Sequence, residues 1–222
     1  MDYSVYLVED NTELGQLLES YLVREGYTTK RFENGASALE AIEDKPDIWV
    51  LDIMLPDIDG FYIVKQIKNK TPSIPVIFIS ARDKELDRVL GLEMGSDDYI
   101  TKPFLPRELV LRVGRLLERS YGGGQNSGKV YIIDGYKIDE GRRSVTDEGA
   151  EIILTSKEAD LILAFAVNVG RPLSRDKLLS IVWDESYFGS DRVVDDLVRR
   201  LRKKLPRINI ETVYGQGYRL IV

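Results

Sequence analysis

The chain has 222 residues, and neither cysteine nor histidine is among them. The missing cysteine excludes disulfides and thiolate metal sites. The missing histidine excludes histidine-based triads, histidine–metal sites and a phosphohistidine carried by this chain. No apolar run approaches the length of a membrane span, and the N-terminus does not resemble a signal peptide. We therefore expect a cytoplasmic protein that makes no membrane contact.

The net charge of −6 is unevenly distributed along the chain. Residues 1–120 carry 22 acidic and 15 basic side chains, whereas residues 121–222 carry 15 acidic and 16 basic ones. The overall charge argues against a nucleic-acid partner, but it hides a local basic cluster near the C-terminus. The cluster consists of Arg199, Arg200, Arg202, Lys203, Lys204 and Arg207.

A stretch of glycine, glutamine, asparagine and serine at 122–128 is typical of a flexible linker. It predicts a domain at 1–120, a linker at 121–128 and a second domain at 129–222. In the first domain, strand and helix candidates alternate five times, which predicts an α/β fold with a doubly wound, five-stranded parallel (βα)5 sheet. The second domain should be α+β, with short antiparallel strands at 130–133, 136–138, 143–145 and 152–154. Its three helices are predicted to begin after Thr155, Ser174 and Ser190, and a hairpin joins 210–213 to 218–222.

Polar side chains stand at the ends of four predicted strands of the first domain. They are Glu9 with Asp10, then Asp52, Ser80 and Lys102. The carboxyl ends of parallel strands form the ligand crevice of an open α/β sheet, so we expect these residues to converge. Three carboxylates repel each other unless a hard cation with oxygen ligands joins them, which indicates Mg²⁺. The lysine and the serine suit a phosphoryl group bound at the same place.

These residues also carry a resemblance to a known family. The first domain resembles the receiver domain, and the whole chain is similar to OmpR/PhoB-type response regulators of two-component signalling. The matching positions, in order, are Glu9-Asp10, Asp52, Ser80-Ala81 and Lys102-Pro103-Phe104.

The resemblance implies that Asp52 is the nucleophile that accepts a phosphoryl group from a cognate sensor histidine kinase. It also implies that the chain is no enzyme beyond its own phosphorylation and dephosphorylation, with Lys102 and Ser80 binding the phosphoryl oxygens. Ser80 and Tyr99 would form the switch that senses the group. The Mg²⁺ ligands implied are Glu9, Asp10, Asp52 and the backbone carbonyl of Met54.

The resemblance further implies a homodimer that forms on phosphorylation through a predicted helix at 84–94 and the last strand and helix of the domain. Exposed ion pairs contribute little free energy, so their role would be to set the register. The expected cross-subunit pairs are Arg88 with Glu108, Asp98 with Arg112, and Asp97 with Arg119.

The predicted helix at 191–205 separates into an apolar side and a charged side. Val194, Leu197, Val198, Leu201 and Leu205 share the apolar side. The charged side carries Arg192, Asp195, Asp196, Arg199 and Lys203, with Arg200 and Arg202 on its flanks. A helix that reads DNA needs such a charged face over an apolar back that docks it.

The second domain resembles the winged-helix domain of the same family. The matching stretches are 154–158, 174–179 with Trp183, 201–205 and 212–219. The resemblance implies a transcription regulator that binds direct-repeat half-sites in duplex DNA and admits RNA polymerase as a further partner. The DNA-contacting residues expected are Arg192, Arg199, Arg200, Arg202, Lys203, Tyr214 and Gln216.

Some positions depart from the family pattern or have simpler interpretations. Tyr214 stands where many relatives carry arginine, and Leu197 replaces a polar residue often seen in the reading helix. Asp57 and Asp59 lie in a sequence typical of a turn. Tyr99 can equally be a core residue. The charges of the 84–94 segment are most often a solvated face, and a soluble surface is the simpler interpretation of the basic helix.

Two other functions compete with a phosphorylation-controlled regulator. A phosphohydrolase of the haloacid-dehalogenase type also uses an aspartate at a strand end, but it needs a second carboxylate two residues later, where this chain has Met54. The other alternative is a regulator that works without phosphorylation. The acidic pair and Lys102 argue against it.

Overall fold

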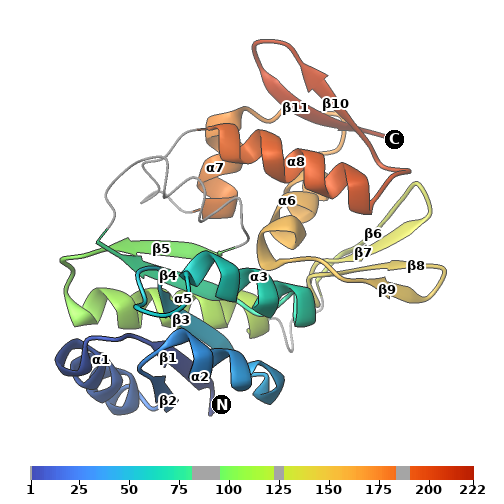
Figure 1. Ribbon diagram of the computed structural model, residues 1–222. Coiled ribbons are helices and arrows are strands. Elements are labelled where there is room, and N and C mark those ends of the chain that lie inside the picture. Colours follow the sequence, from blue (N-terminus) through green and yellow to red (C-terminus); the bar gives the residue numbers. More distant parts are fainter. Residues whose placement is uncertain (1, 82–95, 123–127, 184–190) are drawn as a thin grey trace. The chain divides into compact units, whose positions relative to one another are not determined.

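The computed structural model describes residues 2–81, 96–122, 128–183 and 191–222. The chain divides into two compact units, Met1–Gly122 and Gly123–Val222 (Figure 1). Among the helices within the described ranges, none is long and apolar enough to cross a membrane. The linker expected at 121–128 lies largely outside these ranges and stays a prediction.

The first unit is the doubly wound parallel sheet that the sequence predicts. Its strands lie in the order β2-β1-β3-β4-β5, and all neighbouring strands are parallel. The predicted helix at 84–94 falls outside the described residues. The elements are β1 Ser4–Val8, α1 Thr12–Arg24, β2 Thr28–Phe32, α2 Gly35–Glu40, a 3-10 helix at Ile42–Asp44, β3 Ile48–Asp52, α3 Gly60–Lys70, β4 Val76–Ser80, β5 Asp98–Thr101 and α5 Pro106–Tyr121.

The central strand β3 explains why two apolar layers form. All five of its residues are buried, because helices cover both faces of the sheet. Trp49 and Leu51 pack into the core that contains residues of α2 and α3, whereas Ile48 and Val50 pack into the core that contains residues of α1 and α5. Asp52 is the last residue of this strand, so the fold itself brings a carboxylate to the edge of the core.

Side-chain caps fix the loops beside that edge. Asp59 accepts a hydrogen bond from the Phe61 amide and begins α3. Asp57 accepts bonds from the amides of Gly35 and Ala36 and so holds the start of α2. The structural role predicted for these two turn aspartates is confirmed.

The second unit is a winged helix. A four-stranded antiparallel sheet precedes three helices, and a two-stranded hairpin closes the chain (Figure 1). Its elements are β6 Val130–Ile133, β7 Tyr136–Asp139, β8 Ser144–Asp147, β9 Ala150–Ile152, α6 Ser156–Val167, α7 Arg175–Trp183, α8 Arg192–Lys204, β10 Asn209–Val213 and β11 Gly217–Ile221.

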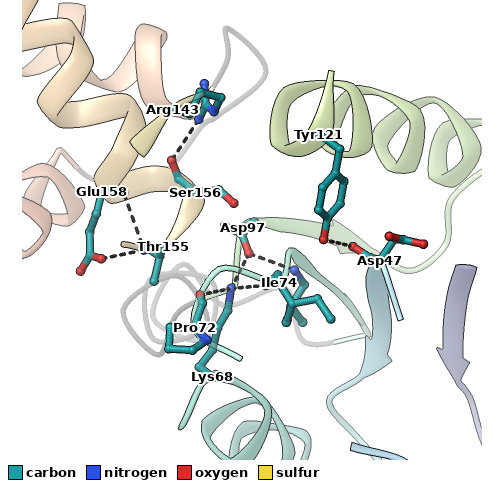
Figure 2. A network of polar contacts seen from close by, with 11 residues as sticks. Asp47, Lys68, Pro72, Ile74, Asp97, Tyr121, Arg143, Thr155, Ser156 and Glu158 are labelled. Atoms are coloured by element: carbon teal, nitrogen blue, oxygen red, sulfur yellow. Dashed lines mark hydrogen bonds and ion pairs between the residues drawn. The ribbon is translucent and has the colours of Figure 1, made fainter. Parts of the chain in front are cut away.

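Two predicted caps are confirmed and one predicted strand is wrong. Thr155 and Glu158 form the predicted capping box of α6 (Figure 2), and the Lys177 amide donates to Ser174 at the start of α7. Ser190 lies outside the described residues. The strand predicted at 152–154 lies at Ala150–Ile152, because Glu148 and Gly149 adopt positive φ angles of 49° and 89° and form a two-residue turn that pairs Asp147 with Ala150.

Candidate functional site

Asp52 is held at the carboxyl end of β3 with only 3% of its surface exposed. The amide of Met54 donates to its Oδ1 over 2.8 Å. The Lys102 ammonium, which follows β5, donates to its Oδ2 over 2.6 Å. Both carboxylate oxygens therefore have a defined orientation at the strand end.

Lys102 also binds the second buried carboxylate of this edge. Its Nζ lies 2.9 and 2.7 Å from the two oxygens of Glu9, which is fully buried. Burial raises the pKa of Glu9, although the hydrogen bonds and charge of Lys102 oppose the rise. Burial alone would lower the pKa of Lys102, but its hydrogen bonds to Asp52 and Glu9 outweigh burial and raise it. The raised pKa of Lys102 fits a pocket with more negative than positive charge.

Asp10 completes the acidic cluster and is exposed. Oxygen atoms of Glu9, Asp10 and Asp52 lie within 4.8 Å of one another. This is the convergence predicted from the strand ends, and hard carboxylate oxygens at such distances fit a magnesium ion. The excess of negative charge over the single Lys102 ammonium fits it as well.

Two glycines allow the backbone and side chains to approach this pocket closely. A Cβ at Gly60, the first residue of α3, would lie 2.6 Å from the carbonyl oxygen of Asp52 and 2.7 Å from Cα of Ile53. A Cβ at Gly15 would lie 3.0 Å from Cδ of Arg31 and 3.7 Å from Cγ of Glu9. Neither glycine is among the residues predicted for this site from the sequence.

The predicted switch residues lie on neighbouring strands, but Tyr99 pairs with Phe78, two residues before Ser80 at the carboxyl end of β4. Ser80 ends β4 and is fully buried, and Tyr99 in β5 is 3% exposed. Tyr99 belongs to the apolar core that also contains Trp49 and Phe78. Its burial agrees with the simple core interpretation in this state of the protein.

Asp97, expected in a cross-subunit pair, is bound within its own unit instead. Lys68 at the end of α3 donates to Asp97 Oδ2 over 2.8 Å and to the carbonyl of Ile74 (Figure 2). The amide of Val76 donates to the same carboxylate oxygen over 2.9 Å. We name this set the Lys68 clasp, and it joins the end of α3 to the starts of β4 and β5.

Three other expected interface residues, Arg112, Asp98 and Glu108, also contact one another within the chain. Arg112 in α5 contacts Asp98 at 3.0 Å and Glu108, one helical turn earlier, at 2.8 Å. Arg119 lies in the last turn of α5, and Arg88 lies outside the described residues. The single chain does not test the cross-subunit pairs, which stay predictions.

In the second unit, α8 has the two sides that the sequence predicts. Val194, Leu197, Val198, Leu201 and Leu205 are all fully buried, so the departure at Leu197 is a core contact. Arg192, Arg199 and Lys203 are exposed on the charged side. Asp196 lies among these cations and contacts two of its neighbours, Arg199 and Arg200.

Arg202 differs from the other candidate readers, because its guanidinium group turns to the hairpin. Its Nε donates to the carbonyl of Ile210 over 3.1 Å, and the group lies 5.7 Å from the ring of Tyr218. Arg175 of α7 lies 5.1 Å from the same ring. The Tyr218 hydroxyl donates to Asp195 over 2.6 Å, and Arg175 donates to Asp195 over 2.7 Å. This cluster ties α7, α8 and the hairpin together.

The hairpin β10–β11 carries the remaining candidates at its tip. Tyr214 is 94% exposed, and Gln216 beside it is also exposed. The hairpin is fixed close to this tip, since Leu173 and Tyr218 exchange two backbone hydrogen bonds of 2.8 and 3.0 Å. The contacts of Arg175 and Tyr218 were not predicted, although both lie in stretches that carry the family resemblance.

Comparison with known proteins agrees with both domains. The chain matches the response regulator receiver domain over residues 5–114 and the C-terminal domain of transcriptional regulatory proteins over residues 149–220. It is 52% identical over 223 residues to the transcriptional regulatory protein CssR of Bacillus subtilis (strain 168), and the alignment covers 100% of this chain and 99% of the relative. It is 38% identical to ResD of the same organism over 230 residues, with coverage of 98% and 95%.

A solved structure leads to the same family. The response regulator DrrB of Thermotoga maritima, described as an OmpR/PhoB homologue, matches with a TM-score of 0.54 and 32% identity over 100% of both chains. The chain therefore belongs to the OmpR/PhoB family of two-component response regulators, in which a receiver domain is joined to a DNA-binding domain that regulates transcription.

Proposed function

We propose that Asp52 accepts a phosphoryl group from a cognate sensor histidine kinase, and that this modification controls DNA binding by the second unit. The observation that carries the proposal is the convergence of Glu9, Asp10, Asp52 and Lys102 at one edge of the sheet. In this proposal residues 1–120 act as the receiver, 121–128 as the linker and 129–222 as the DNA-binding domain. The protein works in the cytoplasm, with RNA polymerase as a further partner.

The chain's own residues would carry out the transfer. An oxygen of Asp52 attacks phosphorus, and the bond from phosphorus to the donor breaks, so that the donor leaves with the electron pair. The Met54 amide and Lys102 orient the carboxylate. Lys102 and Ser80 then bind oxygens of the transferred group.

The acidic cluster supplies a magnesium site in this proposal. Glu9, Asp10 and Asp52 would hold the ion with side-chain oxygens, and Met54 would add its backbone carbonyl. Bound Mg²⁺ supplies positive charge that offsets the charge of the phosphoryl oxygens. The net negative charge left around Lys102 supports this assignment.

Phosphorylation would be sensed by Ser80 and Tyr99 and would promote a homodimer through the β5–α5 surface. Asp98 and Arg112 are already paired within one chain, so the proposed interface requires these residues to exchange partners. Asp97 would have to leave the Lys68 clasp. Sedimentation of phosphorylated Arg112→Glu against the exposed control Arg107→Glu tests the interface, and equal dimer constants would count against it.

The second unit would bind direct-repeat half-sites in duplex DNA, with α8 in the major groove. Arg192, Arg199, Arg200 and Lys203 are placed to contact bases and phosphates. Tyr214 and Gln216 would approach the adjacent groove. Arg202, held by Ile210, would position the hairpin more than it reads bases.

Labelling with a small acyl phosphate and Mg²⁺ tests the central claim. We expect about one phosphoryl group per chain in the wild type and none in Asp52→Asn. The control is Asp57→Asn, which replaces the carboxylate that caps α2 and should be labelled as the wild type is. Equal labelling of wild type and Asp52→Asn would contradict the assignment. Rapid turnover of the donor without a stable labelled chain would favour the phosphohydrolase alternative.

A further inference from the structure

The reading side of α8 contains a carboxylate between its cations. Asp196 Oδ1 accepts a hydrogen bond from the terminal guanidinium nitrogen of Arg199 one turn later, and Arg199 Nε lies 3.2 Å from the same oxygen. The other oxygen, Oδ2, lies 2.9 Å from Nε of Arg200 as an ion pair without hydrogen-bond alignment. One carboxylate is therefore shared by two arginines.

The exposure of these side chains shows where the pair is accessible. The side chain of Arg199 is 72% exposed, that of Arg200 is 24% exposed and that of Asp196 is 18% exposed. Arg199 can therefore reach a duplex while it contacts Asp196, whereas Arg200 lies deeper, against the helix. The carboxylate lies behind the outer arginine and close to any phosphate that Arg199 would neutralise.

The other acidic residue of the helix has a different role. Asp195 accepts from Arg175 and from the Tyr218 hydroxyl, and so belongs to the cluster that fixes the hairpin. Within the described part of the chain, the contacts of Asp196 are with Arg199 and Arg200, both on its own helix. Its contacts therefore change the charge and orientation of the reading arginines rather than the packing of the domain.

A carboxylate at this place has opposite effects on the two kinds of DNA contact. It repels phosphates, and so weakens the sequence-independent attraction on which non-specific binding depends. It also restricts the directions in which two guanidinium groups can point, which favours fixed contacts with base edges such as the O6 and N7 atoms of guanine.

We propose that Asp196 is a specificity-determining residue, which holds Arg199 and Arg200 for base contacts and lowers affinity for DNA of the wrong sequence. This inference rests on the proposed function of α8 as the reading helix. It requires that removal of the charge strengthens non-specific binding and reduces discrimination between sequences.

The test compares the full-length phosphorylated protein with Asp196→Asn on a footprinted site and on scrambled DNA over a salt series. We expect Asp196→Asn to bind scrambled DNA several-fold more tightly. The slope of log K against log salt should steepen by about 0.9, which corresponds to one more neutralised phosphate. The ratio of specific to non-specific affinity should fall by roughly tenfold, the scale of one lost base discrimination.

Two control variants separate this effect from net charge and from damage to the helix. Glu151→Gln makes the same charge change at an exposed position of β9, outside α8, and should leave the salt slope and the affinity ratio unchanged. Asp196→Glu restores the carboxylate and should restore most of the discrimination. The inference is overturned if Asp196→Asn leaves both the salt slope and the ratio of specific to non-specific affinity unchanged. It is also overturned if Glu151→Gln changes them as Asp196→Asn does.

Arginine variants distinguish failure of this inference from failure of the proposed function. If Arg199→Ala and Arg200→Ala bind both DNAs as the wild type does, α8 is not the reader and both proposals fail. If these variants lose affinity while Asp196→Asn keeps the wild-type slope and ratio, only the role of Asp196 is wrong.

Discussion

The pocket around Asp52 and the charged side of α8 have opposite arrangements of charged groups. In the receiver unit, one ammonium group, Lys102, is shared by the carboxylates of Glu9 and Asp52. On α8, one carboxylate, Asp196, is shared by the guanidinium groups of Arg199 and Arg200. Among the described residues each site keeps an excess of one sign, which suits the partner proposed for it: a cation at the first site and a polyanion at the second.

The two sites differ in burial, and this decides what the shared ion contributes to stability. Glu9 and Asp52 are almost completely buried, so loss of their common partner leaves charges that water cannot reach. Arg199 extends into solvent and can be hydrated when Asp196 is lost. The same arrangement should therefore stabilise the fold strongly at one site and weakly at the other.

The largest effect is expected for Lys102→Met, which removes the ammonium group but keeps a side chain of similar length. Thermal or urea unfolding should show a loss of roughly 3 kcal/mol in the free energy of unfolding, because Glu9 and Asp52 remain buried without their cation. Mg²⁺ should restore part of this stability, because it binds the folded acidic cluster. In the exposed control Lys65→Met, the free energy of unfolding should change little. An equally small loss in Lys102→Met would show that burial of the two carboxylates does not decide what the shared cation contributes.

For Lys68→Met we expect a loss in the free energy of unfolding that is similar to, or slightly smaller than, that of Lys102→Met. The side chain of Asp97 is 2% exposed and would lose its cation, at a cost of roughly 2–3 kcal/mol. The matched control is Lys70→Met on the same helix, whose pair with Glu43 is exposed to solvent and contributes little to stability. Urea denaturation of both variants is the measurement, and similar midpoints would show that burial is not the deciding factor.

A smaller effect is expected for Tyr218→Phe, which keeps the ring between Arg175 and Arg202 but removes the hydroxyl. Burial raises the pKa of Tyr218, and the hydrogen bond to Asp195 adds to the rise, so the phenol stays a donor through the neutral range. Loss of this donor should cost about 1 kcal/mol in unfolding experiments. Tyr214→Phe at the exposed hairpin tip is the control, and an equal cost in both variants would argue against the cluster.

The smallest effect on stability is expected for Asp196→Asn. Its pairs lie at the surface of a helix, and such pairs contribute no more than about 0.5 kcal/mol. The unfolding midpoint should stay within error of the wild type while DNA discrimination changes. A loss as large as that of Lys102→Met would show that Asp196 supports the fold.

The residues of the receiver pocket could be predicted because strand geometry places them together. Parallel strands deliver their carboxyl-terminal residues to one edge, so the positions of Asp52 and Lys102 followed from strand pattern alone. The binding of Asp97 could not be predicted in this way. Its partner Lys68 is 29 residues away, and the other groups that fix Lys68 are backbone carbonyls, which no side-chain pattern reveals.

The reading helix shows the same limit on a smaller scale. Its apolar side followed from the spacing of residues such as Val194 and Leu201, and all are buried as predicted. The direction of Arg202 did not follow, since its acceptor is the carbonyl of Ile210 beyond the helix end. The spacing of Asp196 with Arg199 and Arg200 was visible in the sequence, but the helix wheel shows only that these residues are neighbours.

Gly60 has a consequence for how this protein can change over generations. Every codon change that replaces glycine adds a Cβ atom, and here that atom would lie 2.6 Å from the Asp52 carbonyl oxygen. Neither contacting atom belongs to a movable side chain, because the next nearest is Cα of Ile53 at 2.7 Å. Substitution at this codon is therefore constrained by the backbone at the end of β3, although Gly60 itself has no chemical group to contribute.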